Sequence, residues 1–95
     1  MVYVDKITEY PPEIMDAQTR RCGTKWSHLW CDPGKEEELH ALARQIGMSR
    51  SWFQPKKGFS HYDLVPSRRT RAIAAGAVET DLMDWLRERR RLQSA

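Results

Sequence analysis

Two segments near the start of the chain have the residue pattern of a β-strand. Met1–Val4 is apolar and rich in β-branched and aromatic side chains, and it ends at Asp5, which predicts a buried first strand. Side chains alternate along residues 25–31, so a strand here has two different faces. One face of this second strand carries Trp26, His28 and Trp30.

Apolar positions three and four residues apart predict three helices. The clearest begins with Asp32 as its N-cap and ends at Gly47. The second covers residues 67–75 and is stopped by Gly76, and Thr80 is expected to cap the third. The buried stripes consist of Leu39, Leu42, Ala43 and Ile46 in the first helix, and of Leu82, Trp85 and Leu86 in the third.

Shorter strands are predicted between these helices, at residues 51–54, 61–65 and 77–78. Residues 13–24 have no clean periodicity and are expected to form a loop. Alternating strands and helices favour parallel pairing with right-handed crossovers. The expected fold is therefore α/β: a small single domain with a short, mostly parallel three-stranded sheet flanked by helices, followed by a basic C-terminal helix.

Ninety-five residues, of which 40% are hydrophobic, are enough for one domain with a thin core. We place the α/β domain at residues 1–80 and the basic helix at residues 81–95. No apolar run approaches the roughly 18 residues of a membrane span, and the N-terminus does not resemble a signal peptide. A cytoplasmic protein without membrane contact is expected, with Cys22 and Cys31 as free thiols.

Charge is distributed unevenly along the chain. The net charge is +3, with −2 in residues 1–47 and +5 in residues 48–95. A basic second half suits a phosphate-bearing partner such as a nucleotide or nucleic acid. Arginines at the end of the last predicted helix have a second explanation, because cations are favoured there by the helix dipole.

Asp5 and His28 are the first candidates for chemistry. Asp5 follows the first strand, and at the carboxyl end of a parallel sheet it would lie where open α/β folds bind ligands. Its alternative role is to end the strand as a turn former. His28 lies between Trp26 and Trp30, which form either an apolar wall around a titrating imidazole or part of the core.

The strongest constellation is His61-Tyr62-Asp63 followed by Ser67-Arg68-Arg69. An imidazole and a carboxylate two residues apart on a strand lie on one side, where they can orient a tautomer for base chemistry or bind a metal. The start of the following helix, with two guanidinium groups, makes a natural anion site. The simpler alternative is that Ser67 caps the helix and both arginines are solvated.

His40 is expected on the flank of its helix, where its side chain can enter a cleft. A metal centre could draw on four residues, although their spacing matches no established metal motif. These four are Asp5, His28, His61 and Asp63. Dinucleotide-binding, P-loop and G-x-S-x-G motifs are absent from the sequence.

The order of several blocks resembles the DUF4031 family of bacterial and phage proteins. The blocks are VYVD, WSHLW-D, ELHALARQIG, SWFQ, HYDL-PS-R and A-GAVE, which together cover roughly residues 1–80, with the last helix outside. The resemblance implies a stand-alone small domain and assigns no activity, cofactor or catalytic residue. The residues that fall on its pattern are Asp5, Trp26, His28, Asp32, His40, Trp52, His61, Tyr62, Asp63, Ser67 and Arg69.

Three functional hypotheses follow from these residues. The leading one is a module that binds a nucleotide or nucleic acid at a cleft where His28, His40, His61, Asp63 and Arg69 meet, with Arg68 and Arg69 on the phosphate and Tyr62 or a tryptophan on a base. The second is a hydrolase in which a divalent metal activates water against a phosphodiester or related bond. The third is a phage-type protein-interaction module that uses the basic last helix and Trp85.

Overall fold

A five-stranded mixed sheet forms the centre of the protein. The structure is a computed structural model that describes residues 1–11, 13 and 23–94. Most of the predicted loop at residues 13–24, including Cys22, lies outside the described residues. The strands are β1 (Val2–Val4), β2 (Thr8–Glu9), β3 (Lys25–Cys31), β4 (His61–Leu64) and β5 (Val78–Glu79).

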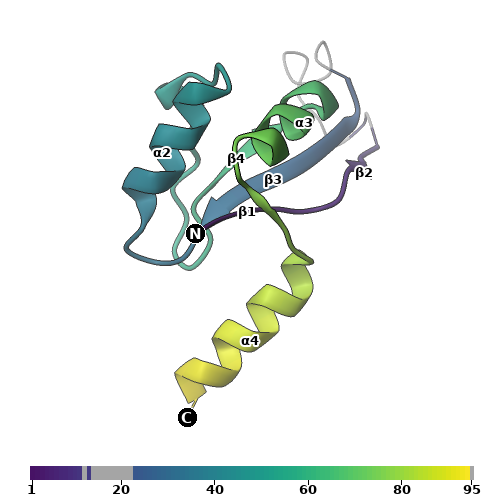
Figure 1. The fold of residues 1–95 in the computed structure, drawn as a ribbon. Helices are drawn as coiled ribbons and strands as arrows, with labels where there is room; N and C mark the ends of the chain where they lie inside the picture. Colours follow the sequence, from purple (N-terminus) through teal and green to yellow (C-terminus); the bar gives the residue numbers. More distant parts are fainter. Residues whose placement is uncertain (12, 14–22, 95) are drawn as a thin grey trace.

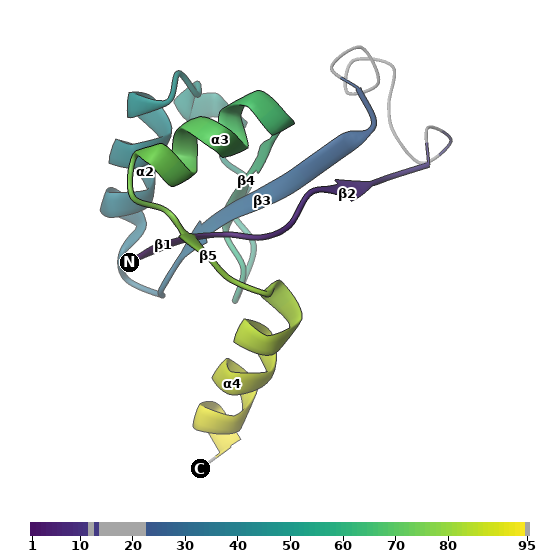
Figure 2. The same ribbon diagram turned by 45° about the vertical axis from the view of Figure 1, so that its right-hand side comes forward.

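Helices cover one face of this sheet and extend the chain beyond it (Figure 1). Residues from α2 and α3 join the core on the sheet, whereas α4 projects away from it in both ribbon views (Figures 1 and 2). No helix in the described part of the chain is long and apolar enough to cross a membrane. The helices are α2 (Glu36–Gln45), the 3₁₀ turn η2 (Arg50–Trp52), α3 (Pro66–Ala74) and α4 (Leu82–Ser94).

The sheet is mixed, so the expectation of a mostly parallel three-stranded sheet was wrong in this detail. β3 pairs antiparallel with β1, β2 and β4, and the parallel pair is β1 with β5. A tight reversal precedes β4 and sets its direction. Gln54 forms an antiparallel bridge with His61, so the chain turns back at residues 55–60 before it enters β4. The predicted strand at residues 51–54 is wrong, because Ser51 and Trp52 belong to η2, capped by the Ser49 hydroxyl, and only Gln54 forms an isolated bridge.

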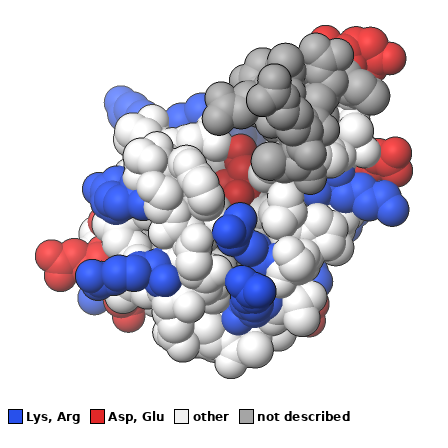
Figure 3. Space-filling view, turned by 90° about the horizontal axis from the view of Figure 1, so that it is seen from above, with Lys and Arg blue, Asp and Glu red and all other residues white. Residues whose placement is uncertain are grey.

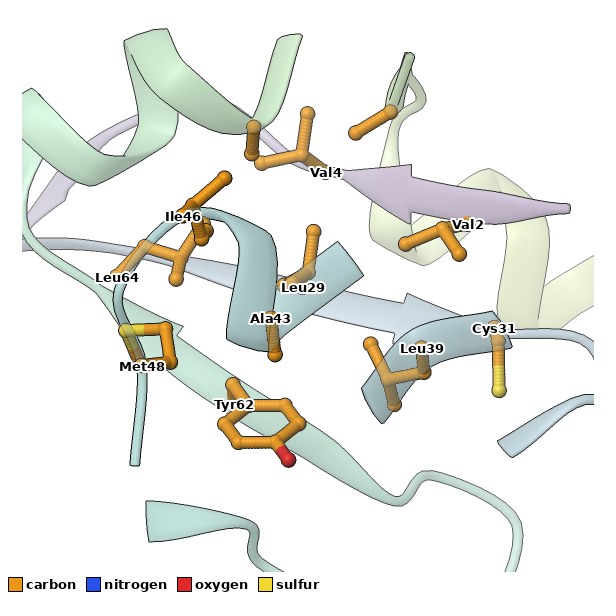
Figure 4. Close-up of a cluster of buried hydrophobic side chains, with 12 residues drawn as sticks. Val2, Val4, Leu29, Cys31, Leu39, Ala43, Ile46, Met48, Tyr62 and Leu64 are labelled. Atoms are coloured by element: carbon orange, nitrogen blue, oxygen red, sulfur yellow. The ribbon is translucent and has the colours of Figure 1, made fainter. Parts of the chain in front are cut away.

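Strand periodicity separates two chemically different faces of the sheet. On the helix side, the side chains of Val2, Val4, Leu29, Cys31, Tyr62 and Leu64 form the core with α2 and α3 (Figure 4). Because neighbouring residues in a strand point to opposite faces, the other face receives the intervening residues. These are Tyr3 and Asp5 from the β1 segment, His28 and Trp30 from β3, and His61 and Asp63 from β4.

The helix ends follow the sequence in some places and depart from it in others. Gly47 and Gly76 have φ values of 88° and 109°, and each closes its helix with the paired backbone bonds of a Schellman motif. Asp32 is not an N-cap, because the turn at Gly34 delays α2 to Glu36 and the Asp32 carboxylate accepts the Tyr3 hydroxyl. The start of α4 also differs from the prediction.

The carboxylate of Asp81, and not Thr80, caps α4 by accepting the backbone N–H of Asp84 at 2.9 Å. The Trp85 ring of this helix lies against Tyr3 and Trp30, with ring centroids 5.9 and 5.8 Å away. The aromatic contact anchors the first turns of α4 on the sheet face that α2 and α3 leave open. The division that we placed at residue 80 stays a prediction.

Candidate metal centre

Asp5 holds His28 through two hydrogen bonds. Asp5 is only 8% exposed, and its Oδ1 accepts the backbone N–H of His28 at 2.6 Å. Its Oδ2 lies 2.7 Å from His28 Nδ1. An ionised carboxylate only accepts hydrogen bonds, so Nδ1 carries the proton, and in the neutral imidazole the lone pair is on Nε2.

His61 has the same tautomer for a different reason. Its Nδ1 lies 3.0 Å from the carbonyl oxygen of Phe59, which can only accept, so Nδ1 donates and Nε2 carries the lone pair. The Phe59 ring also stacks on His61, with centroids 4.5 Å apart and planes at 18°, and meets the His28 ring edge-on at 5.4 Å. Both imidazoles are therefore fixed in orientation.

Asp63 completes a group of three donor atoms with these two imidazoles. Register places Asp63 opposite His28 in the pair of β3 with β4, and its Oδ1 lies 4.0 Å from His28 Nε2 and 3.5 Å from His61 Nε2. All three donor atoms lie within 4.8 Å of one another. The Gln54 amide N–H₂ donates to the second oxygen, Oδ2, and so holds the carboxylate in place.

The pKa values of the two imidazoles are shifted in opposite directions from the ordinary value of 6.5. Burial opposes protonation of His28, but the hydrogen bond and charge of Asp5, together with the charge of Asp63, outweigh it and raise the pKa of His28. Burial lowers the pKa of His61, and the nearby His28 and Lys56 charges act in the same direction, against the hydrogen bond to the Phe59 carbonyl and the charge of Asp63, which both raise it. At neutral pH His61 is thus a neutral imidazole with its lone pair on Nε2.

A pH titration of the three histidines checks this geometry in the metal-free protein. We expect His28 to bind its proton at the highest pH, above 6.5, and both His40 and His61 to bind theirs below 6.5. The ion pair of His28 with Asp5 accordingly makes its full contribution to stability below pH 6.5, the ordinary histidine pKa. This contribution is lost as the pH rises through the raised pKa of His28. Imidazole ¹H–¹³C resonances report each pKa, and a His28 pKa below that of the other two would contradict the arrangement.

A cavity of about 570 Å³ borders the group on the side of His28 and Asp5. Tyr10 also lines it, and the charges of both Asp5 and Asp63 act on its phenol; burial first, then these charges, raise the Tyr10 pKa. The Lys6 and Arg69 side chains and the first turn of α4 form further walls. A molecule in this cavity would lie beside His28 and face a phenol.

His40 does not join this group, although we expected the three histidines to meet. Its Nδ1 lies 2.9 Å from the Tyr62 hydroxyl, and its ring meets Phe53 edge-on at 4.6 Å. Tyr62 is 1% exposed and alternates with His61 and Asp63 along β4, so it points to the helix side of the sheet. The ring of Tyr62 is therefore part of the core and is not open to a stacked base.

The residues at the start of α3 lie apart as well, with one exception. Ser67 is exposed, and Arg68 places its guanidinium 5.3 Å over the ring of Trp52. Arg69 reaches back to the site: its Nε donates to the backbone carbonyl of Asp5 at 2.8 Å and its Nη2 to Glu79 at 2.9 Å. It braces Asp5 and β5 through two of its five N–H donors.

Trp26 lies at the far end of β3, away from the three donor atoms, where its indole N–H donates to the Gly23 carbonyl at 2.9 Å.

Asp5 belongs to the site for a different reason from the expected one. Antiparallel pairing leaves no shared carboxyl edge, and Asp5 meets His28 because both lie on the open face of the sheet. The sequence pattern did not indicate three residues of the site: Phe59, Gln54 and Tyr10. The available signal for the first two was their position around the turn that precedes His61.

Basic side chains do not form one continuous stripe on the face seen in Figure 3. Lys and Arg groups are separated there by uncharged surface, with an acidic group near the middle. On α4, two arginines are paired within the helix, Arg87 with Asp84 at 2.8 Å and Arg91 with Glu88. Positive charge is thus dispersed over this face, and part of it is paired with carboxylates on α4.

Comparison with known proteins places the chain in a family. The model of a family described as "Protein of unknown function (DUF4031)" matches residues 13–92. The matched range contains His28, His61 and Asp63 and extends through most of α4, which we expected to lie outside it, whereas β1, β2 and Asp5 precede it. No curated protein and no solved structure matches the chain.

Proposed function

The chain belongs to the DUF4031 family, and we propose that it is a metal-dependent hydrolase acting on phosphodiester or related bonds. One observation carries the proposal: two imidazole Nε2 lone pairs and one carboxylate oxygen converge within 4.8 Å. In a tetrahedral site with bonds of about 2.0–2.1 Å the donors would be about 3.3 Å apart. Asp63 Oδ1 lies 3.5 and 4.0 Å from the two Nε2 atoms, so the three donors would move closer together on binding a metal.

The surroundings of the three donors also support a metal centre. Metal-binding histidines nearly always donate the other ring N–H to a carboxylate or a backbone carbonyl. His28 does the first, to Asp5, and His61 does the second, to Phe59. A chance ion pair between a histidine and an aspartate has no need of this support on both rings.

Three protein ligands are the number found in catalytic zinc sites, which keep a further position for water or substrate. When bound by these three residues, a divalent cation would lower the pKa of water to about 7 and so make a nucleophile available at neutral pH. The protein's own residues do the rest: Asp5 and Gln54 hold the ligands in place, and Tyr10 offers a phenol beside the cavity. Mixed nitrogen and oxygen ligands suit Zn²⁺ and Mn²⁺.

An anionic substrate is favoured by the cations around the donors. The charge of Lys56 acts on both His28 and His61, and Lys6 and Arg69 line the adjoining cavity. Cations close to a metal centre attract phosphate groups and stabilise the charge that develops during hydrolysis. The binding-module hypothesis is supported less well, because Tyr62 is buried, Arg68 lies over Trp52 and His40 does not meet the other two histidines.

The proposal is tested by metal titration of the full chain. Protein freed of metal by dialysis should bind Zn²⁺ and Mn²⁺ at one site, melt at a higher temperature with either, and then hydrolyse bis(4-nitrophenyl) phosphate. Metal content after purification, calorimetric titration and the release of nitrophenolate measure the three effects. Absence of binding, or the same activity in metal-free protein, would refute the proposal.

Asp5→Asn tests the tautomer on which the site depends. The amide keeps the shape of Asp5, but its N–H₂ would donate to His28 Nδ1 and move the imidazole proton to Nε2, which removes the lone pair. We expect about 10–100-fold weaker metal binding at pH 8, with a melting temperature within a few degrees of wild type. Unchanged affinity would show that Asp5 has a structural role only.

A further inference from the structure

We propose a second site on the opposite side of the sheet, a hollow that binds a phosphate group. It measures about 280 Å³ and is lined by His40, Arg44, Met48, Arg50 and Tyr62, which we call the α2 hollow. Since Tyr62 alternates with His61 and Asp63 along β4, the α2 hollow and the proposed metal centre are separated by the sheet. The two sites can therefore be tested independently.

The charge of the α2 hollow is the first argument. None of the residues that line it is acidic, and two of them are arginines. Over residues 1–11, 13 and 23–94, neither Arg44 nor Arg50 forms an ion pair, whereas Arg69, Arg87 and Arg91 do. Arg50 instead lies over the Phe53 ring at 4.9 Å, which fixes its guanidinium next to the hollow.

The proton on His40 is the second argument. The Tyr62 hydroxyl is buried, and its hydrogen-bond partner in the described part of the chain is His40 Nδ1, at 2.9 Å. A phenol needs an acceptor for its proton, so Tyr62 donates to Nδ1 and the neutral imidazole carries its own proton on Nε2. The hollow thus combines one imidazole of fixed tautomer with two guanidinium groups.

This set of donors matches the chemistry of a phosphate group. Guanidinium groups bind phosphate oxygens in pairs, and charge-assisted bonds are roughly twice as strong as neutral ones. The volume lies just below the roughly 300–1,000 Å³ of pockets for drug-sized ligands, which suits a phosphate group better than a whole large ligand. Met48 and Tyr62 supply the apolar floor.

The titration of His40 connects the site to a measurable quantity. Burial lowers the His40 pKa, and the charge of Arg50 lowers it further, against the raising influence of Glu36 and Glu37 at the other end of α2. A bound dianion would reverse the effect of Arg50 and raise the pKa. A second explanation of Arg44 is that it compensates the dipole at the end of α2, and this explanation predicts no such change.

The test is a titration of metal-free protein with sodium phosphate at constant ionic strength, followed by the imidazole resonances of His40. We expect saturable shifts and a raised His40 pKa, both absent with chloride. Arg44→Gln and Arg50→Gln should each weaken binding at least tenfold. Arg71→Gln, which removes an exposed arginine of α3, is the matched control and should leave the affinity unchanged.

Two further arms identify the source of the phosphate. A nucleoside monophosphate and a short single-stranded oligonucleotide are titrated in the same way, and the tighter of the two names the natural form. Non-saturable shifts, or equal affinity in Arg44→Gln, Arg50→Gln and Arg71→Gln, would overturn the site. Because no metal is present, failure here leaves the proposed hydrolase untouched, and the reverse also holds.

Discussion

Asp63→Asn is expected to weaken binding of Zn²⁺ and Mn²⁺ more than 100-fold and to reduce hydrolysis to the level of metal-free protein. Asp63 supplies the single carboxylate oxygen of the donor group, 3.5 and 4.0 Å from the two Nε2 atoms. Loss of a residue that merely supports a ligand costs about 10–100-fold in metal affinity, so loss of the charged ligand itself should cost more. Calorimetric titration and the bis(4-nitrophenyl) phosphate assay measure both effects.

The change should leave the fold of the metal-free protein intact. The Asp63 side chain is 37% exposed, so an amide there remains hydrated, and we expect the free energy of unfolding to change by about 1 kcal/mol or less. Glu37→Gln is the matched control, because it also removes one negative charge, from an exposed position on α2. Equal metal affinity in Asp63→Asn and Glu37→Gln would place the metal elsewhere.

Trp30→Ala is expected to destabilise the protein by about 3–5 kcal/mol, which is a large part of the roughly 5–15 kcal/mol that stabilises a domain. Trp30 is fully buried, and its ring contacts Tyr3, Phe59 and Trp85 with centroids 5.7, 5.7 and 5.8 Å away. Its removal leaves a cavity behind Phe59, the residue that holds His61. Urea unfolding followed by circular dichroism measures the loss.

Two variants keep this prediction testable if Trp30→Ala does not fold. Trp30→Phe retains most of the ring and removes an indole N–H that has no hydrogen-bond partner among the described residues, so we expect a loss of about 1–2 kcal/mol. Trp52→Ala removes a tryptophan that is 48% exposed and lies over Arg68, and we expect a loss of about 1 kcal/mol or less. Equal losses for Trp30→Ala and Trp52→Ala would contradict the assigned core.

Some of the fold follows from local rules, and these parts could be predicted. The alternation along residues 25–31 gave β3 with its correct bounds and faces, because a strand has a period of two whatever it pairs with. The glycines at 47 and 76 end α2 and α3 because only glycine adopts a positive φ without strain. The period of two along a strand also placed His61 and Asp63 correctly on one side of β4.

The direction of pairing, and with it the position of the site, was decided by tertiary structure. Strand and helix alternation does not specify from which end a strand enters the sheet, and the reversal between Gln54 and His61 makes β4 antiparallel to β3. That pairing sets Asp63 opposite His28, so the site lies on the open face of the sheet and not at its edge. His40 is excluded because its partner, Tyr62, points to the other face.

The sequence by itself therefore determined which residues share a strand face and where most helices end, since these depend on neighbours a few positions away. Which faces meet depends on contacts between residues 23 to 64 positions apart, such as those of Asp5 with His28 and with Arg69. The contact of Asp5 with His28 also fixes the tautomer of His28. Local propensity carries no information about such contacts, because the chain reaches them only when the sheet closes and the core excludes water.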